Sequence, residues 1–396
     1  MVVPRWVRDG GVAAHVAASA AALTQSGTRV AIVSAKVESQ EIPDGVMLYH
    51  SPELFNRKAP VEVRFGEALT CDPTVVHLHQ LDDPHVVDFL RRRVPVVISA
   101  HGYLACTSGY HYFAPGQECP RAHGPGCIPN LLRCAHTRDP RTLPNAYRRA
   151  DRALAALQRA DLAISYSSAV DRHLAINGLA RRRVVPYFPT VAAKTGSGHE
   201  GRRRVVFAGR IVTTKGVKTL VEAAREVHAE FRICGDGWQL QAMRRLASRK
   251  RVEDRVSFKG WLDPDGLAQE FADASVVAVP SLWPEPFGIV GIEAFAAGRP
   301  VVASATGGIG DWLEDGVSGL LVAPGDAGAL AAALSALLDD PQRQQLMGAA
   351  GKAMVAARFS AEHHLAAVTE AYAAARANWQ STRHGGHAAP TATSLT

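Results

Sequence analysis

The sequence predicts an α/β protein of two domains, each built around a parallel β-sheet. Three observations carry this prediction. Short apolar runs alternate with helical patterns through most of the chain, which is typical of a parallel sheet. The length of 396 residues is more than one hydrophobic core usually supports. A polar, glycine-rich segment at 191–203 has the composition of a surface linker between two such units.

The first half begins with an unusually short lead-in. Only residues 1–6 precede the glycine loop of the first helix, whereas a strand normally takes about five or six residues plus its lead-in. We therefore expect a stunted first strand and a weakened first domain, and a misplaced start stays open. Further on, strands are expected at 29–34, 74–78, 95–100 and 162–165, and helices at 11–25 and 151–159.

The second half repeats the alternation of strands and helices. Strands are expected at 205–208, 274–280 and 300–303, and helices at 217–227, from after Gly288 to Ala297, and at 360–379. The last residues, 381–396, contain too few apolar side chains to fold, so we expect a disordered tail.

Composition and charge narrow the class of protein. No apolar run approaches the roughly 18 to 20 residues of a membrane span, and the N-terminus lacks the apolar core of a signal peptide. We expect a cytoplasmic protein. The net charge of +7 favours acidic partners, which include, as a weak peripheral contact, the inner face of a membrane. Arginine clusters lack interleaved aromatic residues, so we interpret them as solvated faces and expect no nucleic acid partner; they lie at 91–93, 148–149, 181–183 and 202–204.

Two glutamates eight positions apart form the strongest functional signal. Glu285 lies in a proline-rich turn after an apolar run, and Glu293 lies about two turns into the helix that should follow. A turn that feeds a helix N-terminus offers free N–H groups and a positive dipole end to an anion. We expect Glu285 beside the reacting end of a ligand and Glu293 near a neutral polyol.

This motif resembles that of the retaining glycosyltransferases of family 4, which carry a glutamate, seven residues and a second glutamate. Their GT-B fold has two Rossmann-like domains that face a central cleft. The resemblance implies that Glu285 lies near the hydroxyls of the donor sugar and that Glu293 binds the ribose of the nucleotide. It also implies that the sugar and phosphate site is lined by the backbone of Phe287, Gly288, Ile289 and Val290.

The resemblance covers nearly the whole chain up to Trp379, most strongly at 205–326 and most weakly at 103–149, where the acceptor should bind. It implies an acceptor-binding domain at 1–190, a linker at 191–203 and a nucleotide-sugar-binding domain at 204–359. A helix at 360–380 should cross back to the first domain, before the tail at 381–396.

A second constellation brings two cations to a loop between a strand and a helix. Arg210 and Lys215 lie in this loop and can balance a pyrophosphate that gains negative charge. The plain alternative is a basic surface loop. In family 4 the matching arginine and lysine hold the donor diphosphate, and turns such as the one at Gly235 surround the base and phosphates. Because no full G-x-G-x-x-G follows Gly209, a nicotinamide cofactor is not supported, and we expect no cofactor.

The N-terminal half carries fewer candidates. Gly10 and Gly11 look like the glycine loop that lies under the donor phosphates in the family. His101 follows an apolar run where family members carry a histidine, so it is expected to contact the donor sugar or to position the acceptor, although a histidine at a strand end is often structural. At Tyr187 the family usually has asparagine.

Cysteines and acidic pairs give little support for a metal. Four cysteines gather in a glycine- and proline-rich region that also contains His111, His123 and His136; they are Cys106, Cys119, Cys127 and Cys134. They form no C-x-x-C pair, so we favour a packed acceptor loop over zinc or disulfides. Asp263 and Asp265 precede a helical pattern and are interpreted as an N-cap. We expect no metal.

These observations predict transfer of a glycosyl group from a nucleotide diphosphate sugar to an acceptor hydroxyl with retention of configuration. The resemblance implies front-face attack, in which the leaving phosphate assists deprotonation. His101, Glu285, Arg210 and Lys215 are the candidate catalytic residues. A phosphorylase, an epimerase or a degenerate relative that serves as a binding partner stay open as alternatives. The sugar, the base, the acceptor and the oligomeric state are not fixed by the sequence.

Overall fold

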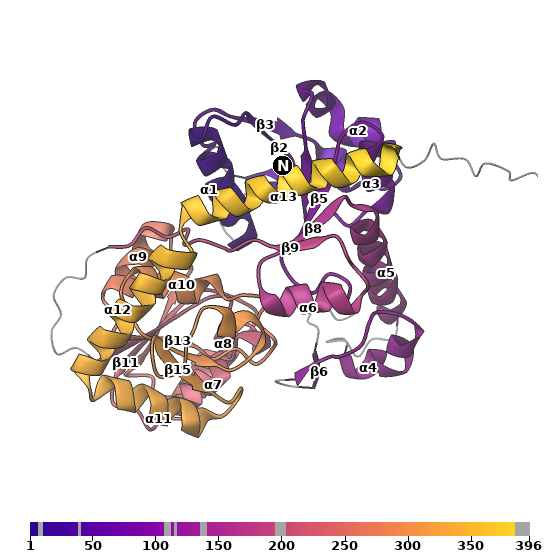
Figure 1. The fold of residues 1–396 in the computed structure, drawn as a ribbon. Coiled ribbons are helices and arrows are strands. Elements are labelled where there is room, and N and C mark those ends of the chain that lie inside the picture. Colours follow the sequence, from indigo (N-terminus) through magenta and orange to yellow (C-terminus); the bar gives the residue numbers. More distant parts are fainter. Residues whose placement is uncertain are drawn as a thin grey trace, which may run out of the picture.

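Two parallel β-sheets, each covered by helices, make up the computed structural model, which describes residues 1–6, 11–38, 41–106, 112–114, 117–134, 141–194 and 203–384 (Figure 1). The first sheet has the order β3-β2-β1-β4-β5-β8-β9 and the second the order β12-β11-β10-β13-β14-β15. All neighbouring strands in both sheets run parallel. Both orders are of the doubly wound type, which confirms the predicted fold class.

The first sheet occupies the N-terminal half. Its strands are β1 (Val2–Trp6), β2 (Val30–Val37), β3 (Val46–His50), β4 (Val76–His79), β5 (Val96–Ala100), β8 (Leu162–Ser165) and β9 (Arg182–Val184). Its helices are α1 (Gly11–Gln25), α2 (Val61–Phe65), α3 (Pro84–Arg91), α4 (Leu131–Cys134), α5 (Leu143–Arg159) and α6 (Ser168–Ile176). A small antiparallel pair, β6 (Tyr112–Ala114) and β7 (Gln117–Glu118), lies between β5 and α4 in the chain. Helix α5 begins eight residues before the predicted one, where Pro144 suits the first turn of a helix.

The second sheet follows after residue 203. Its strands are β10 (Arg204–Ala208), β11 (Glu230–Cys234), β12 (Val256–Gly260), β13 (Val276–Val279), β14 (Val301–Ser304) and β15 (Gly319–Val322). Its helices are α7 (Val217–Ala223), α8 (Leu240–Arg249), α9 (Pro264–Ala272), α10 (Ile289–Ala296), α11 (Ala327–Leu338) and α12 (Pro341–Arg358). As expected, Asp263 caps α9, because its carboxylate accepts from Gly266 N at 2.7 Å.

The first strand has an ordinary length of five residues, so the expectation of a stunted strand was wrong. Strand β1 has five residues, pairs with β2 at four positions and contacts β4, which places it in the middle of the sheet. Val2, Val3 and Trp6 are almost fully buried. Three apolar side chains in five residues suffice here because neighbours cover the strand on both sides and both faces.

The last helix, α13 (Ala361–His384), leaves the second domain and lies across the first (Figure 1). Trp379 Nε1 donates to the Arg91 carbonyl at 2.7 Å, and Asn378 donates to the Asp161 carbonyl at 2.9 Å. The chain therefore joins the domains twice, before β10 and before α13. Within the described ranges, no helix has the length and the apolar composition that a membrane crossing requires.

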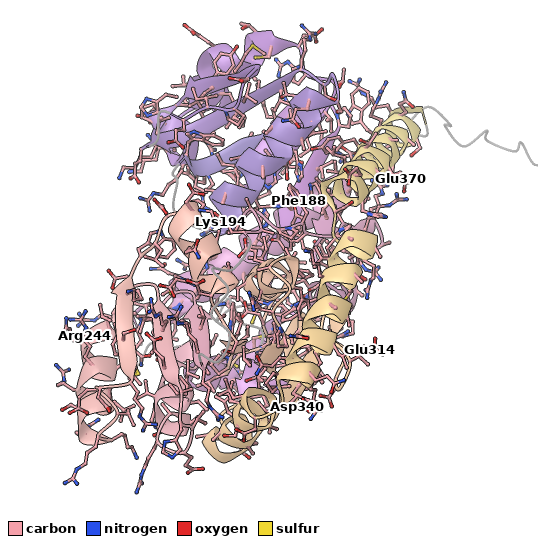
Figure 2. The ribbon with its side chains drawn as sticks, turned by 90° about the vertical axis from the view of Figure 1, so that its left-hand side faces the viewer. Phe188, Lys194, Arg244, Glu314, Asp340 and Glu370 are labelled. Carbon is pink, nitrogen blue, oxygen red and sulfur yellow. The ribbon has the colours of Figure 1, made fainter. Side chains whose placement is uncertain are left out.

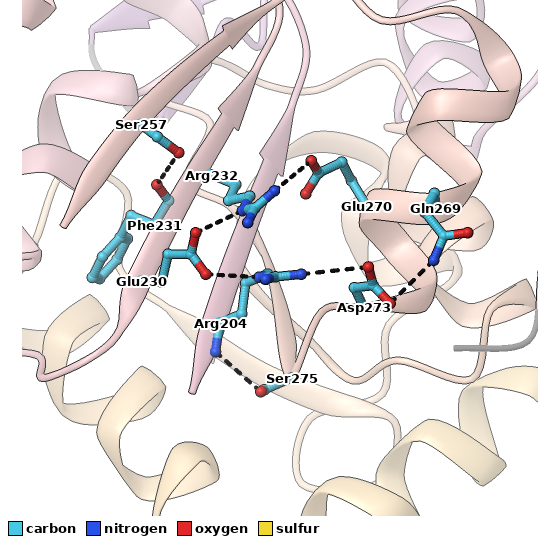
Figure 3. A network of polar contacts seen from close by, with 9 residues as sticks. All are labelled: Arg204, Glu230, Phe231, Arg232, Ser257, Gln269, Glu270, Asp273 and Ser275. Carbon is cyan, nitrogen blue, oxygen red and sulfur yellow. Dashed lines mark hydrogen bonds and ion pairs between the residues drawn. The ribbon is translucent and has the colours of Figure 1, made fainter. Parts of the chain in front are cut away.

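A charged network joins the N-terminal ends of β10 and β11 to α9 (Figure 3). Arg204 Nε lies 3.0 Å from Glu230 Oε2, and its Nη1 lies 3.5 Å from Asp273 Oδ2. Arg232 Nε lies 2.8 Å from Glu230 Oε1, and its Nη1 lies 3.0 Å from Glu270 Oε1. Arg204 is only 2% exposed. The interpretation of the cluster at 202–204 as a solvated face was therefore wrong for Arg204, which is buried because acidic side chains surround its guanidinium.

Candidate functional site

The predicted lysine and the first predicted glutamate contact each other. Lys215 Nζ lies 2.7 Å and 2.8 Å from the two carboxylate oxygens of Glu285. The same carboxylate accepts from Ser281 Oγ at 2.8 Å and from Trp283 Nε1 at 3.1 Å. Glu285 is 4% exposed, so a cation and two neutral donors compensate a buried charge.

Backbone contacts between three loops bring this pair together. Gly216, in the left-handed conformation at φ +71°, would place a Cβ 1.8 Å from the Pro280 carbonyl oxygen. Gly307, at φ +60°, would place one 2.2 Å from the Glu285 carbonyl oxygen. Only glycine allows the loops after β10, β13 and β14 to approach this closely. The lysine loop and the glutamate loop are thereby held at a fixed distance.

The glutamate loop ends in a helix N-terminus. Gly288, at φ +86°, precedes α10, and Trp312 Nε1 donates to the Phe287 carbonyl at 2.6 Å. Gly288, Ile289 and Val290 are half-buried, and because they begin the helix their N–H groups have no acceptor within it. Such a terminus stabilises an anion.

Arg210 and Gly235 lie on two neighbouring loops of the same sheet. Arg210 is exposed and, within the described part of the chain, forms no ion pair or side-chain hydrogen bond. Gly235 N donates to the Gly260 carbonyl at 2.7 Å, which ties the end of β11 to the end of β12. A guanidinium without such partners, in the same connection as Lys215, is suited to an anionic ligand.

Glu293 lies in α10 and faces the connection between the domains. Its Oε1 accepts from Thr190 Oγ1 at 2.9 Å and from Thr190 N at 3.4 Å. Burial raises the pKa of Glu293 to about 7, against the opposing effect of hydrogen bonds from Thr190 and from the Val191 amide. No basic side chain within the described residues pairs with it. Its carboxyl group is thus held only by neutral donors.

His101 lies directly after β5 in a buried cluster of histidines and tyrosines. Its Nε2 lies 2.9 Å from His79 Nδ1, and its Nδ1 lies 2.7 Å from Tyr187 OH. Its ring stacks on Tyr166, with centroids 4.8 Å apart. Burial lowers the pKa of His101 to about 3. Both ring nitrogens are engaged in this state, so a contact with a sugar requires one of these bonds to change.

The remaining candidates lie outside this arrangement. Gly10 falls outside the described residues, and Gly11 is the exposed first residue of α1. Within the described ranges no cysteines are joined as disulfides, and no group of three or more histidine, cysteine or acidic side chains is placed to hold a metal ion. His123 Nε2 lies 2.7 Å from Asp151 Oδ1 instead, while His111 and His136 lie outside the described residues.

Several residues of the site were missed by the sequence reasoning. Ser281 and Trp283 donate hydrogen bonds to the Glu285 carboxylate, and Thr190 donates to the Glu293 carboxylate. Asp311, in the loop after β14, accepts from Ser168 N at 2.6 Å and from Ser168 Oγ at 2.5 Å, which caps α6 from the other domain. Ser281 and Trp283 lie four and two residues before Glu285, so their contacts with it could have been expected from the sequence. The other contacts join distant parts of the chain.

Comparison with known proteins agrees with this architecture. Residues 193–354 match the family described as glycosyl transferases group 1. The chain is 37% identical over 197 residues to a D-inositol 3-phosphate glycosyltransferase of Nocardia farcinica, which covers 47% of this chain and 43% of that protein. The chain spans about half the length of the curated relatives it matches, from 37% to 56%.

Two solved structures share the fold over nearly the whole chain. Sucrose-phosphate synthase from Thermosynechococcus elongatus has a TM-score of 0.66 at 23% identity and covers 98% of this chain and 99% of its own. HepE of Anabaena, in complex with UDP and glucose, has a TM-score of 0.68 at 19% identity. The match covers 94% of this chain and 98% of the HepE chain. Residues 193–354 are therefore similar to glycosyl transferases group 1, in a chain that has the GT-B fold of two parallel-sheet domains.

Proposed function

We propose that this protein transfers a glycosyl group, of the hexosyl type or a related one, from a nucleotide diphosphate sugar to an acceptor hydroxyl with retention of configuration, as in family 4. The observation that carries the proposal is the meeting of Lys215 and Glu285 beside the N-terminus of α10. A cation, a helix dipole and the exposed Arg210 then surround one anion-binding region.

The leaving diphosphate is the group whose negative charge grows most in such a reaction. Lys215 and Arg210 contribute fixed positive charge there, and the N–H groups of Gly288 to Val290 contribute oriented dipoles. Glu285 holds the ammonium group of Lys215 in place. In this mechanism the protein balances the phosphate charge with its own cations, and the departing phosphate takes the proton of the acceptor.

The other parts of the donor are assigned by the resemblance to family 4. Glu293 would bind the ribose, and the sugar would lie between Glu285 and His101. The acceptor, which would be a carbohydrate, a lipid-linked molecule or a small molecule, would enter from the first domain. HepE, which shares the fold, binds UDP, so UDP-sugars are the first donors to test.

Donor turnover tests the proposal. Incubation with UDP-glucose, GDP-mannose and ADP-glucose should release the nucleotide diphosphate slowly by hydrolysis and faster with an acceptor. Proton NMR should show that the anomeric configuration of the product matches that of the donor. Inversion would contradict retention, and phosphate-dependent cleavage would favour a phosphorylase. Saturable binding without any turnover, across donors and acceptors, would favour a degenerate binding protein.

A further inference from the structure

The connection that leads from β9 into the second domain contacts both halves of the proposed site. Tyr187 OH lies 2.7 Å from His101 Nδ1, and the Tyr187 ring lies 5.1 Å from that of Phe287. Three residues later, Thr190 donates to Glu293. Phe188 and Lys194, labelled in Figure 2, lie at the junction of the two domains. One short segment therefore joins the histidine of the first domain to the glutamate of the second.

The hydrogen bonds of Thr190 use the acceptor capacity of one carboxylate oxygen. A carboxylate oxygen has about two lone-pair positions, and Oε1 of Glu293 receives both the hydroxyl at 2.9 Å and the amide at 3.4 Å from Thr190. A ribose diol that engages both carboxylate oxygens needs a lone pair on Oε1. The ribose can use a lone pair of Oε1 only when one of the two hydrogen bonds from Thr190 breaks.

We propose that Thr190 occupies the ribose-binding carboxylate in the donor-free protein and that the ribose of the nucleotide displaces its hydroxyl. This inference rests on the proposed function, because it takes Glu293 as the ribose ligand. Thr190 is then a competitor for the donor rather than a support for it. Because the same connection holds His101 through Tyr187, displacement of Thr190 also frees the segment that fixes the histidine.

Substitution of Thr190 tests this competition. Thr190→Val keeps the shape of the side chain but removes the hydroxyl donor. By calorimetry, Thr190→Val should bind the tightest of UDP, GDP and ADP about three- to tenfold more tightly than the wild type, since one net hydrogen bond no longer opposes binding. The 2′,3′-dideoxy form of the same nucleotide should bind both proteins equally. Thr190→Ser, which keeps the hydroxyl, should behave like the wild type.

Two further variants show whether the effect passes through Glu293. Thr70→Val removes a comparable hydroxyl, which donates to the Glu67 carbonyl at 2.7 Å on the exposed surface of the first domain, and should leave affinity unchanged. In a Glu293→Gln background, Thr190→Val should tighten binding much less than in the wild type. Unchanged or weaker binding by a folded Thr190→Val would overturn this inference alone. Failure of the wild type to bind any of the three nucleotides would overturn the proposed function as well.

Discussion

Lys215 and Glu285 come from different loops, and the Lys215 ammonium group bridges both oxygens of the Glu285 carboxylate at 2.7 Å and 2.8 Å. The pair connects the loop that follows β10 to the loop that leads into α10. A lysine held this way has little freedom to leave the site, so its ammonium group would already be in position for the diphosphate of the proposed donor.

Removal of the Lys215 ammonium group should abolish most of the activity. We expect Lys215→Ala to lower kcat/KM about 10² to 10³-fold, because a preorganised charge at the leaving group is lost. It should also lower the free energy of unfolding by about 1–3 kcal/mol, since Glu285 loses its cation. Lys218→Ala, one turn away and mostly exposed, is the matched control. Full activity in folded Lys215→Ala would contradict the assignment.

Arg210 should act on the diphosphate and not on the nucleoside. We expect Arg210→Ala to weaken UDP binding about tenfold, as loss of one charge-assisted contact would, and to leave uridine binding unchanged. Arg225→Ala, which removes another exposed arginine of the same domain, should change neither affinity. Calorimetric titrations at constant ionic strength measure both. Equal losses for UDP and uridine would mean that Arg210 serves the fold.

Glu293 should make both stability and affinity depend on pH. Its pKa is raised from an ordinary 4.5 to about 7, so the folded state binds the proton more tightly than the unfolded state. Relative to Glu293→Gln, wild-type stability should therefore fall by up to about 3 kcal/mol as the pH rises from 4.5 to 7 and then level off. Nucleotide affinity should rise over the upper part of this window, because an ionised carboxylate accepts hydroxyl protons better. Urea denaturation at a series of pH values measures the free energy of unfolding. The same pH dependence of this free energy in wild type and Glu293→Gln would contradict the prediction.

The buried histidines should weaken the fold in acid. Burial lowers the pKa of His364 to about 4, so below its ordinary pKa of 6.5 the unfolded chain binds a proton that the folded chain does not. Stability is thus lost as the pH falls. We expect His364→Gln to reduce the loss between pH 7 and pH 5 by about 2 kcal/mol, as measured by urea denaturation. His363→Gln, on the exposed side of the same helix, is the control.

Most of the fold could be predicted because its elements follow local patterns. Short apolar runs bounded by glycine and proline indicated β4, β5, β8, β10, β13 and β14 to within three residues at each end. The predicted helix at 217–227 ends earlier, at Ala223, because the last turn tightens after it. Arg204 was misjudged because its burial depends on Glu230 and Asp273, which are distant in sequence.

The site was predictable in its components and not in its contacts. The predicted order of strand, turn and helix places Lys215, Glu285 and Glu293 after the C-terminal ends of strands in the second sheet. The glycine and proline residues of the turns indicate where those strands end. That Lys215 reaches Glu285 depends on the close approach at Gly216, which only the packed structure reveals. Thr190 and Asp311 act across the domain junction, where no local pattern of residues is informative.

Thermal unfolding with UDP, GDP, ADP and TDP tests the central claim, that the second domain binds a nucleotide diphosphate through Lys215, Arg210 and Glu293. Ligands that bind the native state raise its apparent stability by mass action, by about 2.7 kcal/mol at a hundredfold excess over Kd. We predict that one nucleotide raises the Tm of the wild type and that Glu293→Ala loses most of this shift. No shift with any of the four, in a protein that unfolds cooperatively, would contradict the account.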